Sequence, residues 1–173
     1  MTIENILMAN TSLDTISQPT ENQTPSLSIQ RIYTKDVSFE SPHAPEAFKT
    51  TETPTLDLQI HIKTPLPSKD IYEVELHLTV KATIASTNTE AAKTLFCVEV
   101  KQAGIFEIQW LEPAQLAAVL NVTCPTILYP YASALIADLV SRSTFMPPHL
   151  APINFEAIYA QHQVDATPTS YDA

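Results

Sequence analysis

The chain has 173 residues but only one glycine, Gly104. Loops that cradle phosphate groups need several glycines at fixed offsets, because the backbone must approach the ligand closely. A P-loop and a dinucleotide-binding fingerprint are therefore excluded, and a nucleotide-driven cycle with them. The 14 prolines provide the chain breaks instead.

The charge balance limits the partners. The formal net charge is −10, and the nine Lys and Arg residues are scattered from Arg31 to Arg142. Such a chain repels a nucleic-acid backbone, so a basic protein surface is the favoured partner. The only cysteines, Cys97 and Cys124, form no disulfide framework, which is typical of a reducing cytoplasm. We expect no signal peptide, and no stretch approaches the roughly 18 apolar residues of a membrane span.

The strongest secondary-structure signal is an alternation at residues 72–84, where every even position is apolar or alanine and every odd position is polar. Period two predicts a strand with one buried face and one solvated face. Less regular alternation predicts further strands at 28–40, 55–62 and 94–102, with a connection at 41–48 and a turn at 86–93. Four consecutive strands with short links predict an antiparallel sheet that is solvated on one face.

Beyond Gly104 the period changes to that of a helix. We predict a short helix at 111–122 and a longer one that begins at Pro130 and continues the apolar stripe of residues 128–140. The segment MPPHLAP cannot continue a helix, and Asn154 is expected to cap a last one. Strands followed by helices predict an α+β domain.

No catalytic constellation emerges from the polar residues. His61 and His77 are expected on neighbouring strands, but no third metal ligand stands at useful spacing, so solvated histidines are favoured over a metal site. Asp36 and Glu40 lie roughly 13 Å apart on one strand face, which is too wide for a glycosidase pair. Cys97 has no assignable His–Asp partners. We therefore expect no enzyme activity, metal or cofactor.

Two other groups of residues are ambiguous on pattern alone. Acidic residues on the polar sides of the strands, such as Glu73, Glu75 and Glu99, indicate either a solvated face or a docking surface for a basic partner. Apolar residues near the proline-rich joints are most simply core. Alternatively, they line a groove that accepts extended apolar segments; these residues are Phe48, Leu56, Leu58, Ile60, Tyr131, Phe155 and Tyr159.

Several stretches, in order along the chain, resemble the SecB family of bacterial protein-export chaperones. They are SIQRIYTKDVSFE followed by SPHAP, then GIF at 104–106, CPTILYPYA at 124–132, VSRSTF at 140–145 and LAPINFEAIY at 150–159. The likeness covers residues 27–163. It leaves a polar stretch at 1–26, expected to be a flexible arm longer than is usual in the family, and a tail at 164–173.

The resemblance implies a fold, an assembly and a function. SecB-like proteins have a four-stranded antiparallel sheet and C-terminal helices, and they assemble as a dimer of dimers. They are cytoplasmic, ATP-independent holdases that bind unfolded precursors and pass them to the SecA motor. The family's docking face for SecA matches Asp36, Glu40, Cys97 and Glu99. Its client grooves lie between the crossover after the first strand and the last helices, where Leu56, Leu58 and Ile60 match.

The chain departs from the family pattern at three places. Glu52 stands near the crossover proline where a Trp is familiar, so the groove is expected to be less aromatic. Ala103–Gly104 replaces Gly-Gly, which predicts a stiffer turn. Cys97 stands where Leu is common, which puts its place in the docking patch in question.

Three other functions remain open. One is a SecB-like chaperone dedicated to a toxin–antitoxin system. Another is a metal-dependent or hydrolytic enzyme that uses His61, His77 and the acidic face. The last is a structural oligomer that binds no client.

Overall fold

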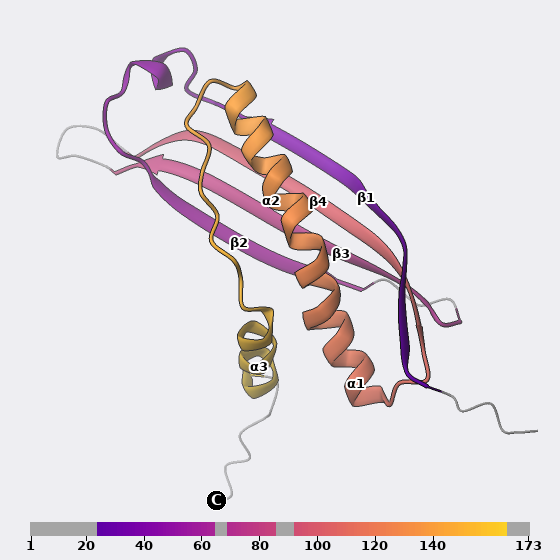
Figure 1. Ribbon diagram of the computed structural model, residues 1–173. Helices are drawn as coiled ribbons and strands as arrows, with labels where there is room; N and C mark the ends of the chain where they lie inside the picture. The colour runs from indigo at the N-terminus through magenta and orange to yellow at the C-terminus, as the bar shows by residue number, and fades with distance from the viewer. Residues whose placement is uncertain (1–23, 65–68, 86–91, 166–173) are drawn as a thin grey trace, which may run out of the picture.

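The computed structural model describes residues 24–64, 69–85 and 92–165 (Figure 1). Its strands form one antiparallel sheet in the order β1-β4-β3-β2, and a long helical run crosses one face of it. The predicted α+β domain of four strands followed by helices is confirmed. The elements are β1 (Ser26–Glu40), η1 (Glu46–Lys49), β2 (Thr55–Lys63), β3 (Ile71–Ile84), β4 (Lys93–Gln109), α1 (Pro113–Ala118), η2 (Val119–Thr123), α2 (Cys124–Arg142) and α3 (Phe155–Asp165).

Parts of three predictions lie outside the described residues: the arm up to residue 23, positions 86–91 of the turn, and the tail from residue 166.

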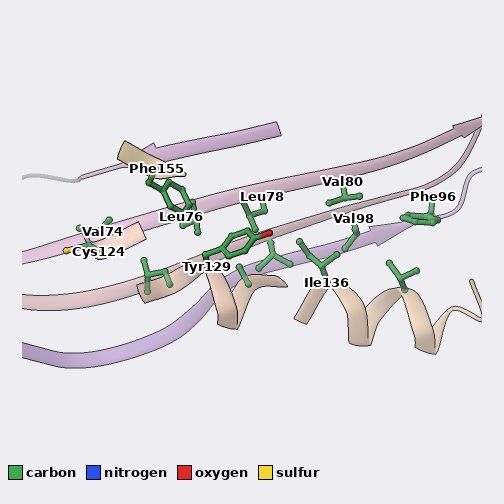
Figure 2. Packing of buried hydrophobic residues seen from close by; sticks show 14 of the residues in the cluster. Val74, Leu76, Leu78, Val80, Phe96, Val98, Cys124, Tyr129, Ile136 and Phe155 are labelled. Carbon is green, nitrogen blue, oxygen red and sulfur yellow. The ribbon is translucent and has the colours of Figure 1, made fainter. Parts of the chain in front are cut away.

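The core lies between the sheet and α2, and β3 is at its centre. Val74, Leu76, Leu78 and Val80 are fully buried, as their even spacing predicts. Figure 2 shows these side chains with Val98 of β4 facing the helix, where they meet residues such as Ile136. The apolar residues of the predicted alternation therefore form the covered face of the sheet, and the apolar stripe of α2 packs on them.

Two β-bulges divide β1. The ladder with β4 shifts register at Gln30 and again at Lys35, so each is an extra residue on β1. Each extra residue reverses which face the next side chain points to. A single alternation along the predicted strand at 28–40 would put Tyr33 on the same face as Ile29 and Val37. Tyr33 instead lies between the bulges and points away from α2, so the alternation is broken there.

Strand β4 continues well beyond its predicted end at residue 102. The stretch GIFEIQ keeps the alternation, with Phe106 and Ile108 buried on the covered face. The predicted turn and change of period at residues 103–104 are wrong, since both residues lie inside the strand and pair with β1 and β3.

Gly104 is needed for space rather than for an unusual backbone conformation, because its φ angle is not positive. A Cβ atom built there would lie 2.6 Å from the ring of Phe106 and 3.1 Å from Leu128 of α2. Both neighbours are fully buried and have little room to move. The single glycine therefore lets α2 lie close to the sheet.

The helical run is continuous from Pro113 to Arg142, with one π-helical turn at η2. The prediction that its second part begins at Pro130 is wrong. Pro130 lies inside α2 on the exposed side, where its ring does not meet the sheet and only one backbone hydrogen bond is lost. By length and composition this run of 30 residues would qualify as a membrane span, against our expectation, but its buried side packs on the sheet as in the core helix of a folded domain.

The last helix, α3, follows an extended segment that runs back along α2 (Figure 1). The side-chain oxygen of Asn154 accepts a hydrogen bond from the Ala157 N–H at 3.0 Å, which confirms the predicted cap. Tyr129 holds the preceding segment by donating a hydrogen bond to the Ala151 carbonyl at 2.6 Å.

Candidate functional site

The face of the sheet that points away from α2 carries most of the charged strand residues. No described helix covers it (Figure 1). We call it the uncovered face. Its charged, histidine and cysteine residues include Asp36, Glu40, Asp57, His61, Glu73, Glu75, His77, Lys81, Cys97, Glu99 and Lys101.

The strand register brings the four predicted docking residues together on this face. Glu40 lies directly opposite Cys97 across β1 and β4, and Glu99 lies two residues further along β4. Asp36 is four residues before Glu40 and on the same side, because both follow the second bulge. We call these four residues the acidic patch.

Charge within the acidic patch is unevenly compensated. The Asp36 carboxylate accepts a hydrogen bond from Lys101 Nζ at 2.7 Å, which holds the pKa of Asp36 below its usual range. Within the described part of the chain, Glu40 and Glu99 have no ion-pair partner. The unbalanced negative charge of the patch therefore comes from these two glutamates.

The surroundings of Cys97 disfavour its thiolate form. Partial burial and the neighbouring carboxylates of Glu99 and Glu40 raise the pKa of its thiol. The reactive thiolate is consequently scarce at neutral pH. Cys97 contributes an apolar, polarisable surface between two acidic side chains.

A second cluster on the uncovered face contains a buried carboxylate. Glu75 is only 6% exposed, so the prediction that it lies on a wet face is wrong. Lys35 Nζ lies 2.8 Å from carboxylate oxygens of both Glu73 and Glu75. The Tyr33 hydroxyl donates to Glu73, and His77 Nε2 contacts Glu75. The bulge at Lys35 and the reversed Tyr33 make this network possible, and the sequence carries no marker of either.

Hydrogen bonds from Lys35 and then Tyr33 lower the pKa of Glu73. For Glu75, burial raises the pKa, but hydrogen bonds from Lys35 and His77 outweigh burial and leave the pKa lowered. Both carboxylates are thus held ionised by the network.

The histidine pair predicted from the sequence exists, since His61 and His77 are cross-strand partners on β2 and β3. The described residues contain no group of three or more His, Cys, Asp or Glu side chains that would hold a metal ion. His77 contacts Glu75 instead.

The clearest hollow near the predicted grooves has a volume of about 500 Å³ and lies between the crossover after β1 and the end of α2. We call it cavity A. Phe48 and Thr50–Pro54 line it from the crossover, Phe96 from β4, and Thr144–Met146 from the segment after α2. Met146 is 89% exposed at its edge. A second cavity of about 490 Å³ lies against the crossover and shares Ala47, Thr50, Glu52 and Leu95 with cavity A.

Aromatic rings form the wall of cavity A. The Phe48 ring lies 5.0 Å from that of Phe145, and Phe145 lies 5.3 Å from Phe96. Phe39 of β1 stacks on Phe96 at 5.8 Å. The expectation of a less aromatic groove took no account of these phenylalanines, of which only Phe48 was predicted to line it. Their spacing along the chain gives no sign that they meet.

The other predicted groove residues are divided among three places. Leu56, Leu58 and Ile60 follow the crossover on the covered face of edge strand β2, where Leu56 is exposed and the other two are half-buried. Tyr131 is exposed on α2, away from the described cavities, and Tyr159 is half-buried on α3.

Phe155 is 2% exposed and packs edge-on against Tyr129. Both line a cavity of about 370 Å³ between α2 and the segment that follows it. We call it the α2 cavity. Because Phe155 is otherwise buried, a ligand could contact it only from inside this cavity.

The fold is that of a small α+β protein whose described residues form an aromatic-lined cavity on one side of the sheet and an acidic patch on the other. A family model described as preprotein translocase subunit SecB matches residues 20–166. The chain belongs to the SecB family of protein-export chaperones.

Individual relatives agree with this assignment. The chain is 43% identical over 145 residues to the protein-export protein SecB of Polaromonas sp., covering 84% of this chain and 93% of that protein. It is 46% identical over 143 residues to the SecB of Haemophilus ducreyi, covering 82% of this chain and 81% of that protein. Among solved structures, the fold is similar to a Mycobacterium tuberculosis SecB-like chaperone in complex with a HigA1 antitoxin peptide. The TM-score is 0.59 at 19% identity, over 73% of this chain and 90% of that chain.

Proposed function

We propose that this protein is an ATP-independent holdase that binds unfolded precursor proteins in the cytoplasm and delivers them to the SecA motor for export. The observation that carries this proposal is cavity A, which is lined by aromatic rings and open beside a row of apolar side chains on β2. The membership of the SecB family supports the same conclusion.

Cavity A suits a client that has no fixed sequence. An unfolded chain offers apolar side chains in no set order, so its binding site must use generic apolar contacts. Each Leu or Phe buried from water contributes roughly 1.5–3 kcal/mol before ordering costs are subtracted. The edge strand β2 adds a row of backbone groups beside Leu56, Leu58 and Ile60, to which an extended segment can pair.

The acidic patch is the proposed docking surface for SecA. Glu40 and Glu99 supply uncompensated negative charge, and Cys97 supplies apolar surface between them. Because this patch and cavity A lie on different sides of the sheet, a motor can dock while the client remains bound. Electrostatic complementarity of this kind acts mainly on association and specificity.

The proposed assembly is a homotetramer, built as a dimer of dimers. Strand β1 is an edge strand of 15 residues, and only 39% of the most apolar window of the run from Pro113 to Arg142 is buried within the chain. A long edge strand and an exposed apolar helix face are both surfaces that a second copy can cover. Several grooves on one particle raise client affinity through effective concentration.

The proposal is tested by charge substitutions in cavity A and on the two faces of β2. Phe48→Arg places a cation in cavity A, and Leu58→Arg places one on the covered face of β2. Each is expected to weaken binding of an unfolded precursor roughly ten-fold, the equivalent of one lost apolar side-chain contact. Gln59→Arg adds the same charge at the neighbouring position on the uncovered face and should leave client affinity unchanged. Fluorescence anisotropy of a labelled precursor measures the affinity, and circular dichroism confirms that each variant is folded.

Light scattering with and without the precursor reports the oligomeric state and client capture together. Full client affinity in folded Phe48→Arg and Leu58→Arg variants would refute the assignment of this groove. Capture of one antitoxin alone, with no unrelated precursor bound, would favour the dedicated toxin–antitoxin chaperone instead.

A further inference from the structure

Three exposed apolar side chains lie at the end of the sheet farthest from the crossover. Leu27 and Ile29 are in the first residues of β1, and Trp110 directly follows the end of β4. The ladder pairs Leu27 with Ile108, two residues before Trp110, so the backbones of Leu27 and Trp110 are within about 10 Å of each other. We call Leu27, Ile29 and Trp110 the β1-start patch.

Trp110 is unusual in both its backbone and its exposure. It is the only tryptophan of the chain, its φ angle is 60°, and its side chain is 54% exposed. A bulky side chain in the left-handed region is strained, and such strain persists where the surroundings or a function compensate for it. The described cavities, the core and the acidic patch make no use of Trp110.

The chain itself offers an occupant for this patch. The 23 residues that precede the described part enter the fold here, because β1 begins at Ser26, opposite Gln109 and beside the start of α1 (Figure 1). Leu13 and Ile16 stand in that stretch, and Ile16 is separated from Ser26 by only ten positions. Ten residues can span up to roughly 33 Å when fully extended, which is more than the width of the patch. A short tether also gives these residues a millimolar-range effective concentration at the patch.

We propose that Leu13 and Ile16 of the N-terminal arm dock on the β1-start patch, with Trp110 at the centre of the contact. The patch then becomes an intramolecular interaction surface, separate from the groove for clients and from the acidic patch. This inference does not depend on the proposed holdase function.

The single tryptophan reports directly on this contact. In the full-length chain, acrylamide quenching of Trp110 fluorescence is compared among the wild type, Leu13→Asp/Ile16→Asp and Thr11→Asp/Thr15→Asp. The last variant adds the same two charges in the same stretch but keeps both apolar side chains. If arm docking covers about half of the exposed surface of Trp110, Leu13→Asp/Ile16→Asp should raise the quenching constant roughly two-fold and shift the emission to longer wavelength, since the tether otherwise keeps the patch occupied. The control variant should match the wild type.

Three results would overturn the proposal. Equal quenching in all three proteins means that the arm does not cover Trp110. An equal rise in both variants means that added charge, and not a lost apolar contact, is responsible. Quenching that falls as protein concentration rises, equally in all three proteins, means that a second copy covers the patch.

Discussion

The two faces of the sheet are made by the same four strands, but one is mainly apolar and the other carries most of the charged residues. On the covered face, Leu78 and Val100 are paired across β3 and β4 and are sealed beneath α2. On the uncovered face, the adjacent residues Thr79 and Glu99 are paired in the same ladder, and Glu99 is exposed. One residue along the chain thus separates a buried side chain from an exposed one, because successive side chains of a strand point in opposite directions.

The uncovered face is itself divided. Near the crossover it is open and carries unbalanced negative charge at Glu40 and Glu99. Further along, around Glu75, it is partly closed by Lys35, which the bulge brings over the neighbouring strands. Polar residues on this face are therefore of two kinds: Glu40 and Glu99 are exposed to solvent, whereas Lys35 and Glu75 form an ion pair across the strands.

The largest expected effect is the difference in unfolding free energy between substitutions on the two faces. Leu78→Ala should lower the free energy of unfolding by about 2–5 kcal/mol, since it removes a fully buried side chain and leaves a cavity. Thr79→Ala, its neighbour on the uncovered face, should cost less than about 1 kcal/mol. Urea denaturation at one fixed protein concentration measures both. Similar losses in the two variants would mean that the uncovered face is packed against another surface.

An intermediate effect is expected at Glu75, where the uncovered face is closed. Glu75→Gln should lower the free energy of unfolding at pH 7 by about 1 kcal/mol, at the low end for a buried charged hydrogen-bond partner. The low end applies because Lys35 is 40% exposed and water can replace the lost carboxylate.

The pH dependence identifies the cause of this loss. The pKa of Glu75 is lowered in the folded state, so its contribution is complete above the ordinary glutamate pKa of 4.5 and is lost as the pH falls through the folded value. The unfolding free energies of the wild type and Glu75→Gln should therefore converge below about pH 4. Glu99→Gln, on the same face but exposed and without an ion pair, should leave the unfolding free energy at pH 7 nearly unchanged. Parallel curves for Glu75→Gln and the wild type from pH 7 to pH 3 would contradict the network.

The smallest effect on stability, and the most specific one on binding, is expected at the acidic patch. Glu99→Lys should weaken SecA binding roughly ten-fold while client binding stays unchanged, because an exposed charge contributes up to about 1 kcal/mol and its reversal counts twice. Glu107→Lys makes the same change on the same strand and face, roughly 27 Å away, and should have little effect. Biolayer interferometry with immobilised SecA and with a precursor gives both affinities. Equal losses of the two partners in Glu99→Lys, or equal losses of SecA binding in the two variants, would reject a separate docking surface.

The sequence predicted those parts of the fold where one side chain after another follows a single period. Strand β3 was found with nearly its true limits because Tyr72 to Ile84 alternate without interruption. Asp36 and Glu40 of the acidic patch were placed on one face for the same reason, since the stretch between them contains no bulge.

The errors have physical causes of their own. A bulge adds a residue without any characteristic side chain, so neither the reversal of Tyr33 nor the burial of Glu75 could be foreseen. Gly104 was interpreted as a break, although close packing of a helix requires glycine just as a turn does. Pro130 was interpreted as a start, although a proline on the solvent side of a helix costs only one hydrogen bond. The aromatic wall of cavity A depends on contacts between distant segments, which periodicity does not encode.

Because α2 approaches the sheet closely at Gly104, a larger side chain there would tilt the whole helix. Leu128 rests over this glycine, and Arg142, where the helix ends beside cavity A, is about 21 Å further along the axis. A methyl group at position 104 would push up on the helix at that resting point, and the tilt would displace the far end by more than the push itself. We therefore expect Gly104→Ala to change the width of cavity A, although residue 104 does not line it.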